Sequence, residues 1–267
     1  MKNNYFKLQV VAAIVLSILM LSCTQQTTTQ EQVTTSLSKE IKEISPGILE
    51  GYLSKDEIPN SLQLVPPPPE EGSAALMLDQ EMAGKYVELE DEARKEQASK
   101  DAVLSFPEAT EAFNTVLDVE ISEENTPHLY MILRRTLADA GLSTYAAKNH
   151  YQRQRPFMVN NTPICTPDEE AMLRKDGSYP SGHTAIGWAW ALILAEVLPD
   201  QADVIMERGL DFGISRNVCN VHWHSDVVYG RMMGAAAVAA LHANTEFIVD
   251  LEAAKKEVET LNGSPKK

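Results

Sequence analysis

The chain has 267 residues, of which 44% are hydrophobic and 23% are charged, so it is long enough for one sizeable core and too apolar to be disordered throughout. Its 38 acidic and 23 basic residues give a formal net charge of −15. This charge argues against a nucleic-acid-binding surface, because phosphate backbones are recognised by positive patches. We therefore expect one folded domain that binds no nucleic acid.

The first 22 residues have the layout of a lipoprotein-type signal peptide. Lys2 and Lys7 precede an apolar run over residues 8–21, and Cys23 follows directly after Ser22. A positively charged start followed by a short apolar core is typical of secretory signals. We expect cleavage before Cys23 and attachment of lipid to its thiol, which would hold the protein at a membrane surface. Simple cleavage and an uncleaved anchor are the alternatives.

The residues after the signal are polar and simple in composition. Residues 24–36 read TQQTTTQEQVTTS, which is typical of a flexible linker. We predict a flexible polar tether over residues 23–45 and a folded domain over residues 46–262. The apolar stretches at residues 185–198 and 232–241 are too short to span a bilayer. The predicted membrane contact is therefore through the N-terminal lipid only.

The pattern of the folded part favours helices. Residues 74–98 have helical spacing and strong helix formers, and a clearer helix begins at Thr126-Pro127 and stops at Gly141. Residues 185–198 and 227–245 also have helical patterns, and the second is rich in small residues that allow close packing, either internally or between subunits. Strand signals are scarce. The fold class predicted is all-α, a helical bundle with short connections.

The first of three candidate functional segments is basic. Residues 140–167 contain Lys148, Arg153 and Arg155 and no Asp or Glu. Lys148 and Arg155 are seven residues apart, so on a helix they share a face, and Pro156 would end or distort that helix. A guanidinium fork and a lysine pointing one way can hold phosphoryl oxygens. A solvated basic surface is the alternative.

The second segment combines a turn with the start of a helix. Pro180-Ser181-Gly182-His183 directly precedes the apolar helix predicted near Ala185. Backbone N–H groups at a helix N-terminus bind anions, and the missing side chain of Gly182 permits close approach. His183 would stand beside that anion. A turn that only caps a helix is the alternative.

The third segment contains two histidines and an aspartate. His222 and Asp226 follow Ser215-Arg216 and, if helical, meet on one face four residues apart. Asp226 would then fix one ring nitrogen of His222 and leave the other free to act as a nucleophile. A purely structural His–Asp pair is one alternative. Together with His224, the two residues also fit the His-x-His-x-Asp motif of binuclear metal hydrolases.

Taken together, the three segments resemble the signature of the superfamily of type 2 phosphatidic acid phosphatases and vanadium haloperoxidases. That signature is Lys-x6-Arg-Pro, then Pro-Ser-Gly-His, then Ser-Arg-x5-His-x3-Asp, and every position is matched. Stretches such as VPPPPEEGSAA and KDGSYPSGHTAIGWAWALILAE are similar to the bacterial class A non-specific acid phosphatases, over roughly residues 51–254. His224 departs from that subgroup, which usually has glutamine there.

The resemblance implies an all-α acid phosphatase that is exported to the periplasm. It further implies broad specificity for small phosphate monoesters, nucleotides among them, a homo-oligomer, and no metal ion or other cofactor. Together with the signal segment, it predicts a periplasmic protein anchored to the cell envelope by lipid on Cys23. Cys165 and Cys219 would then be in an oxidising compartment, either paired as a disulfide or as two buried free thiols.

Roles for the site residues follow as a hypothesis. His222 attacks phosphorus and forms a phosphohistidine, Asp226 orients His222, and His183 protonates the leaving group and later activates water. The phosphate ligands predicted are Lys148, Arg155, Ser181, Gly182 and Arg216. With ordinary histidine pKa values, activity should fall above about pH 7 as the required charge on His183 is lost.

Two other functions are compatible with parts of the sequence. A haloperoxidase of the same fold would hold vanadate between the same cations, with His222 as its axial ligand. A non-catalytic lipoprotein would use the basic pocket only to bind phosphate. Similarity to the acid phosphatases outside the signature disfavours the first, and the pairing of His222 with Asp226 opposite a second histidine disfavours the second.

Overall fold

Helices dominate residues 34–262, the part of the chain that this computed structural model describes, which confirms the all-α prediction. Within these residues the only strands are β1 (Glu43–Ser45) and β2 (Ile48–Leu49), which form a small antiparallel hairpin. The predicted signal peptide, residues 1–22, and the lipidation site Cys23 lie outside the described residues.

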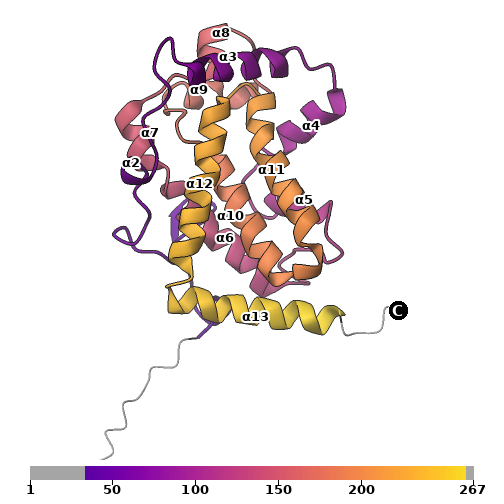
Figure 1. Ribbon diagram of the computed structural model, residues 1–267. Coiled ribbons are helices and arrows are strands. Elements are labelled where there is room, and N and C mark those ends of the chain that lie inside the picture. Colours follow the sequence, from indigo (N-terminus) through magenta and orange to yellow (C-terminus); the bar gives the residue numbers. More distant parts are fainter. Residues whose placement is uncertain (1–33, 263–267) are drawn as a thin grey trace, which may run out of the picture. The chain divides into compact units, whose positions relative to one another are not determined.

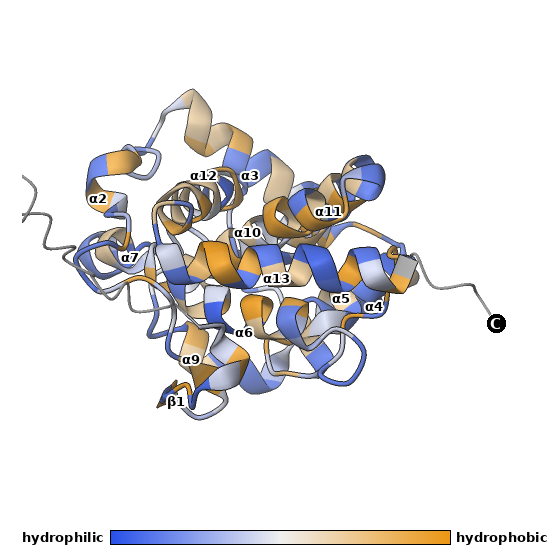
Figure 2. Cartoon of the chain, turned by 90° about the horizontal axis from the view of Figure 1, so that it is seen from below, coloured by the Kyte–Doolittle hydropathy of each residue, from blue (hydrophilic) through white to orange (hydrophobic). Residues whose placement is uncertain are grey.

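The centre of the fold is a group of long helices (Figure 1). They are α6 (Pro127–Leu142), α10 (Gly182–Val197), α11 (Ala202–Val218) and α12 (His224–Leu241). Residues of α10 are buried on nearly all sides, because small and apolar side chains follow one another from Thr184 to Ala195. The last helix, α13 (Thr245–Asn262), crosses one end of this group, and Figure 2, seen from that end, shows it in front of the other helices.

Glycines let α12 approach α10 closely. A Cβ atom on Gly234 would lie 2.4 Å from the carbonyl oxygen of Ala185, and one on Gly230 would lie 2.6 Å from that of Ser181. Neither distance is tolerable, so both positions require glycine at this separation of the helices. The small residues of the predicted helix at 227–245 therefore serve packing inside the subunit, and the homo-oligomer stays a prediction.

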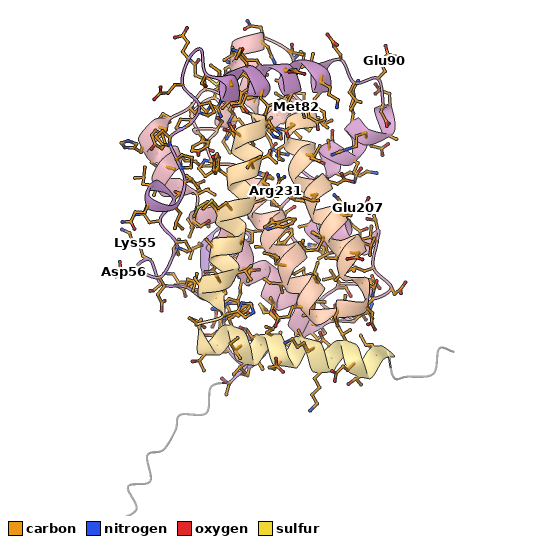
Figure 3. The ribbon with its side chains drawn as sticks, viewed as in Figure 1. Lys55, Asp56, Met82, Glu90, Glu207 and Arg231 are labelled. Carbon is orange, nitrogen blue, oxygen red and sulfur yellow. A yellow bond between two sulfur atoms is a disulfide. The ribbon has the colours of Figure 1, made fainter. Side chains whose placement is uncertain are left out.

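Shorter helices surround this centre. They are α2 (Ser61–Leu64), α3 (Ala74–Val87), α4 (Glu92–Lys100), α5 (Glu111–Asn114), α7 (Tyr145–Tyr151), α8 (Pro156–Asn160) and α9 (Glu170–Leu173). The single helix predicted over residues 74–98 is divided into α3 and α4, because Asp91 caps a new helix by accepting a hydrogen bond from the backbone N–H of Arg94, at 2.9 Å. Figures 1 and 3 show α3, which carries the labelled Met82, lying across the ends of α11 and α12 opposite to α13.

The prediction of a flexible tether over residues 23–45 is wrong at its C-terminal end. Ser36 is buried, and its backbone N–H donates to a carboxylate oxygen of Asp250 in α13 at 2.8 Å. β1 pairs with β2 a few residues later. Buried hydrogen bonds and strand pairing make residues 36–45 part of the folded unit, because the polar composition of the segment conceals these specific partners.

A disulfide joins Cys165, in the loop before α9, to Cys219 at the end of α11. The two cysteines lie in a small apolar cluster with Phe157, Leu173 and Val221. The bond therefore ties the loop after α8 to the segment that leads into α12.

Within residues 34–262, no single helix is long and apolar enough to cross a bilayer. α12 and α13 meet that criterion only as a pair, and the pair is bent by 96°.

Candidate active site

Three helix ends meet at the end of the bundle covered by α3. They are the N-termini of α10 and α12 and the C-terminus of α11, and the backbone N–H of Ser181 donates to the carbonyl oxygen of Asp226 at 3.0 Å. A cavity of about 570 Å³ opens here. Its lining includes the predicted site residues Lys148, Arg155, Gly182, His183 and His222, and the apolar residues Ile44, Ile48, Leu104, Leu142, Tyr145 and Met172.

Lys148 and Arg155 come together, but they do not share one helix. α7 ends at Tyr151, and Gln152 adopts a left-handed conformation with φ of 46°, so the chain turns before Arg155 precedes α8. Both side chains are almost fully buried, 3% and 1% exposed. Burial, together with the charge of Arg155, lowers the pKa of Lys148 to about 8. Lys148 is therefore charged at acidic and neutral pH.

Asp176 is a residue of the cavity that the sequence analysis did not identify. Its Oδ2 atom lies 2.9 Å from Arg155 Nη2 and 3.2 Å from Lys148 Nζ, so one carboxylate oxygen contacts both cations. The side chain is 33% exposed and lines the cavity. Its position directly before the Gly177-Ser178 turn is the only signal in the sequence, and an isolated acid between Lys175 and a glycine does not reveal a site.

Arg216 differs from Lys148 and Arg155, because no hydrogen-bond acceptor in the described part of the chain contacts its guanidinium. It occupies the last turn of α11 and is fully buried. Its Nε, Nη1 and Nη2 atoms have no hydrogen-bond partner within residues 34–262. Burial lowers its pKa to about 10, which still leaves it charged at neutral pH. An unpartnered buried guanidinium is costly unless an anion binds to it.

Ser181 and Gly182 form the predicted turn into α10. Ser181 is the N-cap, and its Oγ atom accepts hydrogen bonds from Thr184 N at 3.3 Å and from Thr184 Oγ1 at 2.9 Å. A hydroxyl accepts two bonds and donates one, so the proton of Ser181 remains available for an anion. A Cβ atom on Gly182 would lie 3.8 Å from Lys148 Cε, so the start of α10 adjoins the Lys148 side chain.

His222 and Asp226 contact each other, although not within one helix. α12 begins at His224, so His222 precedes it while Asp226 lies in its first turn, with Nδ1 of His222 and Oδ2 of Asp226 3.3 Å apart. The other ring nitrogen, Nε2, lies 3.1 Å from Arg155 Nη1. A guanidinium only donates, so Nε2 carries the lone pair and Nδ1 carries the proton. This is the tautomer that a nucleophilic Nε2 requires.

The electrostatic environment keeps His222 neutral. Burial lowers its pKa well below 6.5, and the positive charges of Arg155, Lys148 and Arg216 lower it further. His222 therefore retains its lone pair at acidic pH.

His183 lies in the first turn of α10, on the same cavity. Its Nε2 atom is 3.0 Å from the carbonyl oxygen of Ala102, which can only accept, so Nε2 carries a proton and Nδ1 is the atom left to exchange one. Burial and then the charge of Arg216 lower the pKa of His183 well below 6.5. The unliganded protein therefore holds His183 neutral, in contrast to the charged state expected from an ordinary histidine.

The His-x-His-x-Asp pattern does not bring metal ligands together. Among residues 34–262, no group of three or more His, Cys, Asp or Glu side chains lies close enough to hold a metal ion. Asp226 instead accepts hydrogen bonds from the backbone N–H of Trp223 at 2.8 Å and from Arg153 at 2.6 Å.

Comparison with known proteins places this arrangement in a class. Residues 129–248 match the PAP2 superfamily. The chain is 44% identical over 207 residues to a non-specific acid phosphatase of Providencia stuartii, which covers 77% of this chain and 84% of that protein. It is 40% identical over 193 residues to an acid phosphatase of Zymomonas mobilis, and the aligned part is 72% of this chain and 73% of that protein. It is 36% identical over 222 residues to a non-specific acid phosphatase of Salmonella typhimurium, and the aligned part is 83% of this chain and 89% of that protein.

The chain therefore belongs to the non-specific acid phosphatases of the PAP2 superfamily, as the three sequence segments predicted. It is an enzyme of the phosphoric monoester hydrolase class.

Proposed function

We propose that the protein hydrolyses phosphate monoesters through a phosphohistidine on His222, without a metal ion. The observation that carries this proposal is the buried guanidinium of Arg216, which has no hydrogen-bond partner among the described residues and whose charge acts on both His222 and His183. A phosphoryl group bound there would supply the missing acceptors. Lys148 and Arg155 line the cavity together with both histidines, and with the Ser181 hydroxyl they would neutralise the remaining oxygens in the transition state.

The reaction proceeds in two steps. Nε2 of His222 attacks phosphorus as Arg155 turns its donor to a phosphoryl oxygen, the N–P bond forms, and the bond to the leaving oxygen breaks. That oxygen takes a proton from Nδ1 of His183. In the second step Nδ1 accepts a proton from water as the water oxygen attacks phosphorus, the N–P bond breaks, and inorganic phosphate is released. Asp226 holds the Nδ1 proton of His222 and stabilises the ring as it becomes positive.

The test of this function is phosphate release from an aryl phosphate by a protein lacking residues 1–23, with and without EDTA. We expect turnover that resists the chelator and is greatest at acidic pH. Activity that EDTA abolishes and added metal restores would contradict the mechanism.

The lowered pKa of His183 predicts a pH optimum further below neutrality than an ordinary histidine would give. His183 must be protonated to serve as the acid, so kcat/KM, which reports the free enzyme, should decline at a pH below 6.5. Bound phosphate adds negative charge and raises the pKa of His183, so the decline in kcat should lie at higher pH. Because the pKa of His222 is well below 6.5, protonation of His222 should not reduce activity at mildly acidic pH. Profiles of kcat and kcat/KM between pH 3 and 9 check whether kcat/KM declines below pH 6.5 and whether kcat declines at a higher pH than kcat/KM.

Replacement of His183 should discriminate between leaving groups. We expect His183→Ala to lower kcat/KM for an alkyl phosphate by about 10²- to 10⁴-fold, the usual contribution of a general acid. The loss should be smaller for p-nitrophenyl phosphate, whose leaving group departs without a proton. Equal losses on the two substrates would remove His183 from the role of acid.

The apolar wall of the cavity supports broad specificity. The wall is formed by Ile44 and Ile48 of the hairpin, Leu142 at the end of α6, Tyr145 at the start of α7, and Met172 of α9. These side chains can cover a leaving group without selecting it by charge or by a fixed set of hydrogen bonds. We propose that many monoesters are accepted, nucleotides among them, and that apolar leaving groups gain affinity from this wall.

The hairpin provides the test of that proposal. We expect Ile44→Ser combined with Ile48→Ser to raise KM for naphthyl phosphate about 10-fold, because two apolar contacts with the naphthyl ring are lost, while KM for glycerol phosphate changes little. Leu78→Ser, at an exposed position on α3 outside the cavity, serves as control. An equal change in both KM values would show that the wall does not contact the leaving group.

We further propose that the enzyme acts in the periplasm, attached by lipid on Cys23. The disulfide between Cys165 and Cys219 supports an oxidising compartment. Incorporation of labelled palmitate that Cys23→Ser abolishes would test the anchor, and its absence from the full-length protein would contradict it.

A further inference from the structure

A second buried ionic cluster lies behind the His222–Asp226 pair and has no role in the steps above. Arg153 donates from Nη1 to Asp226 Oδ1 at 2.6 Å and from Nη2 to Asp79 Oδ2 at 2.7 Å. Asp79 and Asp226 are 1% and 0% exposed, and the Arg153 side chain is 10% exposed. One guanidinium thus bridges two buried carboxylates that belong to α3 and α12.

Arg153 is the charged partner that Asp226 needs while His222 is neutral. The Oδ2 atom of Asp226 contacts the backbone N–H of Trp223 and the ring of His222, whereas Oδ1 contacts Arg153. A buried carboxylate without a cation is strongly destabilised. Because each oxygen of the Asp226 carboxylate accepts a hydrogen bond from a different donor, the plane of the carboxylate is fixed. The direction in which Oδ2 faces His222 Nδ1 is therefore fixed as well.

Asp79 in turn fixes Arg153 and the start of α12. Its two oxygens accept from the backbone N–H of Ser225 at 2.7 Å and from Ser225 Oγ at 2.6 Å, and Arg153 Nη1 also donates to Ser225 Oγ at 2.8 Å. A carboxylate is favourable at a helix N-terminus, where the first N–H groups lack partners. The guanidinium of Arg153 also lies 5.3 Å from the ring of Trp223.

The burial pattern of α3 supports a specific role for this contact. Within α3, all of which the structure describes, Asp79 is the only fully buried residue. A surface helix normally buries an apolar face. On α3 the apolar residues Leu76, Met82 and Tyr86 are only half-buried. The one fully buried side chain is the carboxylate of Asp79, which contacts Ser225 of the helix that carries Asp226.

We propose that Arg153 and Asp79 are positioning residues for the nucleophile, with Arg153 holding the Asp226 carboxylate and Asp79 holding Arg153. The inference rests on the phosphohistidine mechanism proposed above. Neither residue touches substrate. Their effect reaches the reaction through the orientation of Asp226 and through the charge that Asp226 presents to His222.

The charges of Arg153 and Asp79 should shift the pKa of His222 in opposite directions. His222 is surrounded by charged or titratable groups from four helices and from the segment before α8. They are Lys148 of α7, Arg155 before α8, His183 of α10, Arg216 of α11 and Asp226 of α12. Arg153 offsets the charge of Asp226, so removing its positive charge should raise the pKa of His222. Removing the negative charge of Asp79 should lower it.

The experiment compares Arg153→Gln, Arg153→Lys and Asp79→Asn. For Arg153→Gln we expect kcat to fall about 10- to 100-fold, the magnitude known for outer groups that orient metal-ligating side chains, with KM nearly unchanged. The pKa of His222, measured by NMR of histidine labelled with ¹³C at Cε1 and assigned with His222→Ala, should rise. Arg153→Lys should retain the wild-type pKa and recover part of kcat, and Asp79→Asn should shift the pKa downward.

Arg135→Gln is the matched control, because Arg135 is a buried arginine held by Glu246 in the contact between α6 and α13. It should lower the melting temperature without moving the pKa of His222. Folded Arg153→Gln protein with the wild-type kcat and pKa would overturn the inference, as would Arg153→Lys moving the pKa as far as Arg153→Gln. Absence of a labelled phosphohistidine in the wild-type enzyme would instead refute the proposed mechanism, so the two failures are distinguishable.

Discussion

Replacement of His222 by alanine is expected to abolish phosphate release while leaving the fold intact. The loss should be about 10⁴-fold or more, because removing a nucleophile eliminates the covalent route altogether. Nε2 of His222 lies 3.1 Å from Arg155 Nη1, and its ring lines the same cavity as Lys148 and His183. The alanine variant removes a buried ring, so far-ultraviolet circular dichroism and the melting temperature must accompany the assay.

His242→Ala provides the control for this experiment. His242 follows α12 at the far end from the site and contacts Glu196 at 2.8 Å. Its loss should leave kcat/KM unchanged. Substantial turnover by folded His222→Ala protein would remove His222 from the role of nucleophile.

Replacement of Arg216 by methionine should have opposite effects on activity and stability. We expect kcat/KM to fall about 10³-fold, the lower end of the range for an arginine that stabilises a transferring phosphoryl group. In the absence of phosphate, the melting temperature should stay the same or rise, because a buried charge that no side chain or backbone group within residues 34–262 partners is replaced by an apolar chain of similar size. Inorganic phosphate should stabilise the wild-type protein and not the variant.

Arg231→Met is the matched control for Arg216→Met. Arg231 is a half-buried residue of α12 that does not line the cavity, and it is labelled in Figure 3. The control should preserve kcat/KM and the stabilisation by phosphate. A strong loss of stability in phosphate-free Arg216→Met would mean that the guanidinium supports the fold and is not reserved for an anion.

Much of the site could be predicted because its residues are fixed by spacing within three short segments. Lys148 with Arg155, Ser181 with Gly182, and His222 with Asp226 are each local in sequence. The expected geometry was wrong in two cases. The left-handed turn at Gln152 and the start of α12 at His224 interrupt the helices on which those pairs were placed, and turns of this kind depend on tertiary contacts that periodicity does not contain.

The parts that could not be predicted depend on contacts between distant segments. Asp79 precedes Arg153 by 74 residues, and nothing near it marks it as a partner of the site. Ser36 and Asp250 are 214 residues apart, so the docking of the segment after residue 33 could not be read from its polar composition. The lowered pKa of His183 likewise results from burial and from Arg216 of another helix.

The most direct test of the mechanism is to trap the covalent intermediate. The enzyme lacking residues 1–23 is mixed with ³²P-labelled aryl phosphate in the presence of EDTA, quenched in alkali within milliseconds, and digested for peptide mapping. Phosphohistidine survives alkali, so we predict label on the peptide that contains His222 and none in the His222→Ala variant. Rapid phosphate release with no labelled peptide at any quench time would contradict a phosphohistidine and favour direct attack by water.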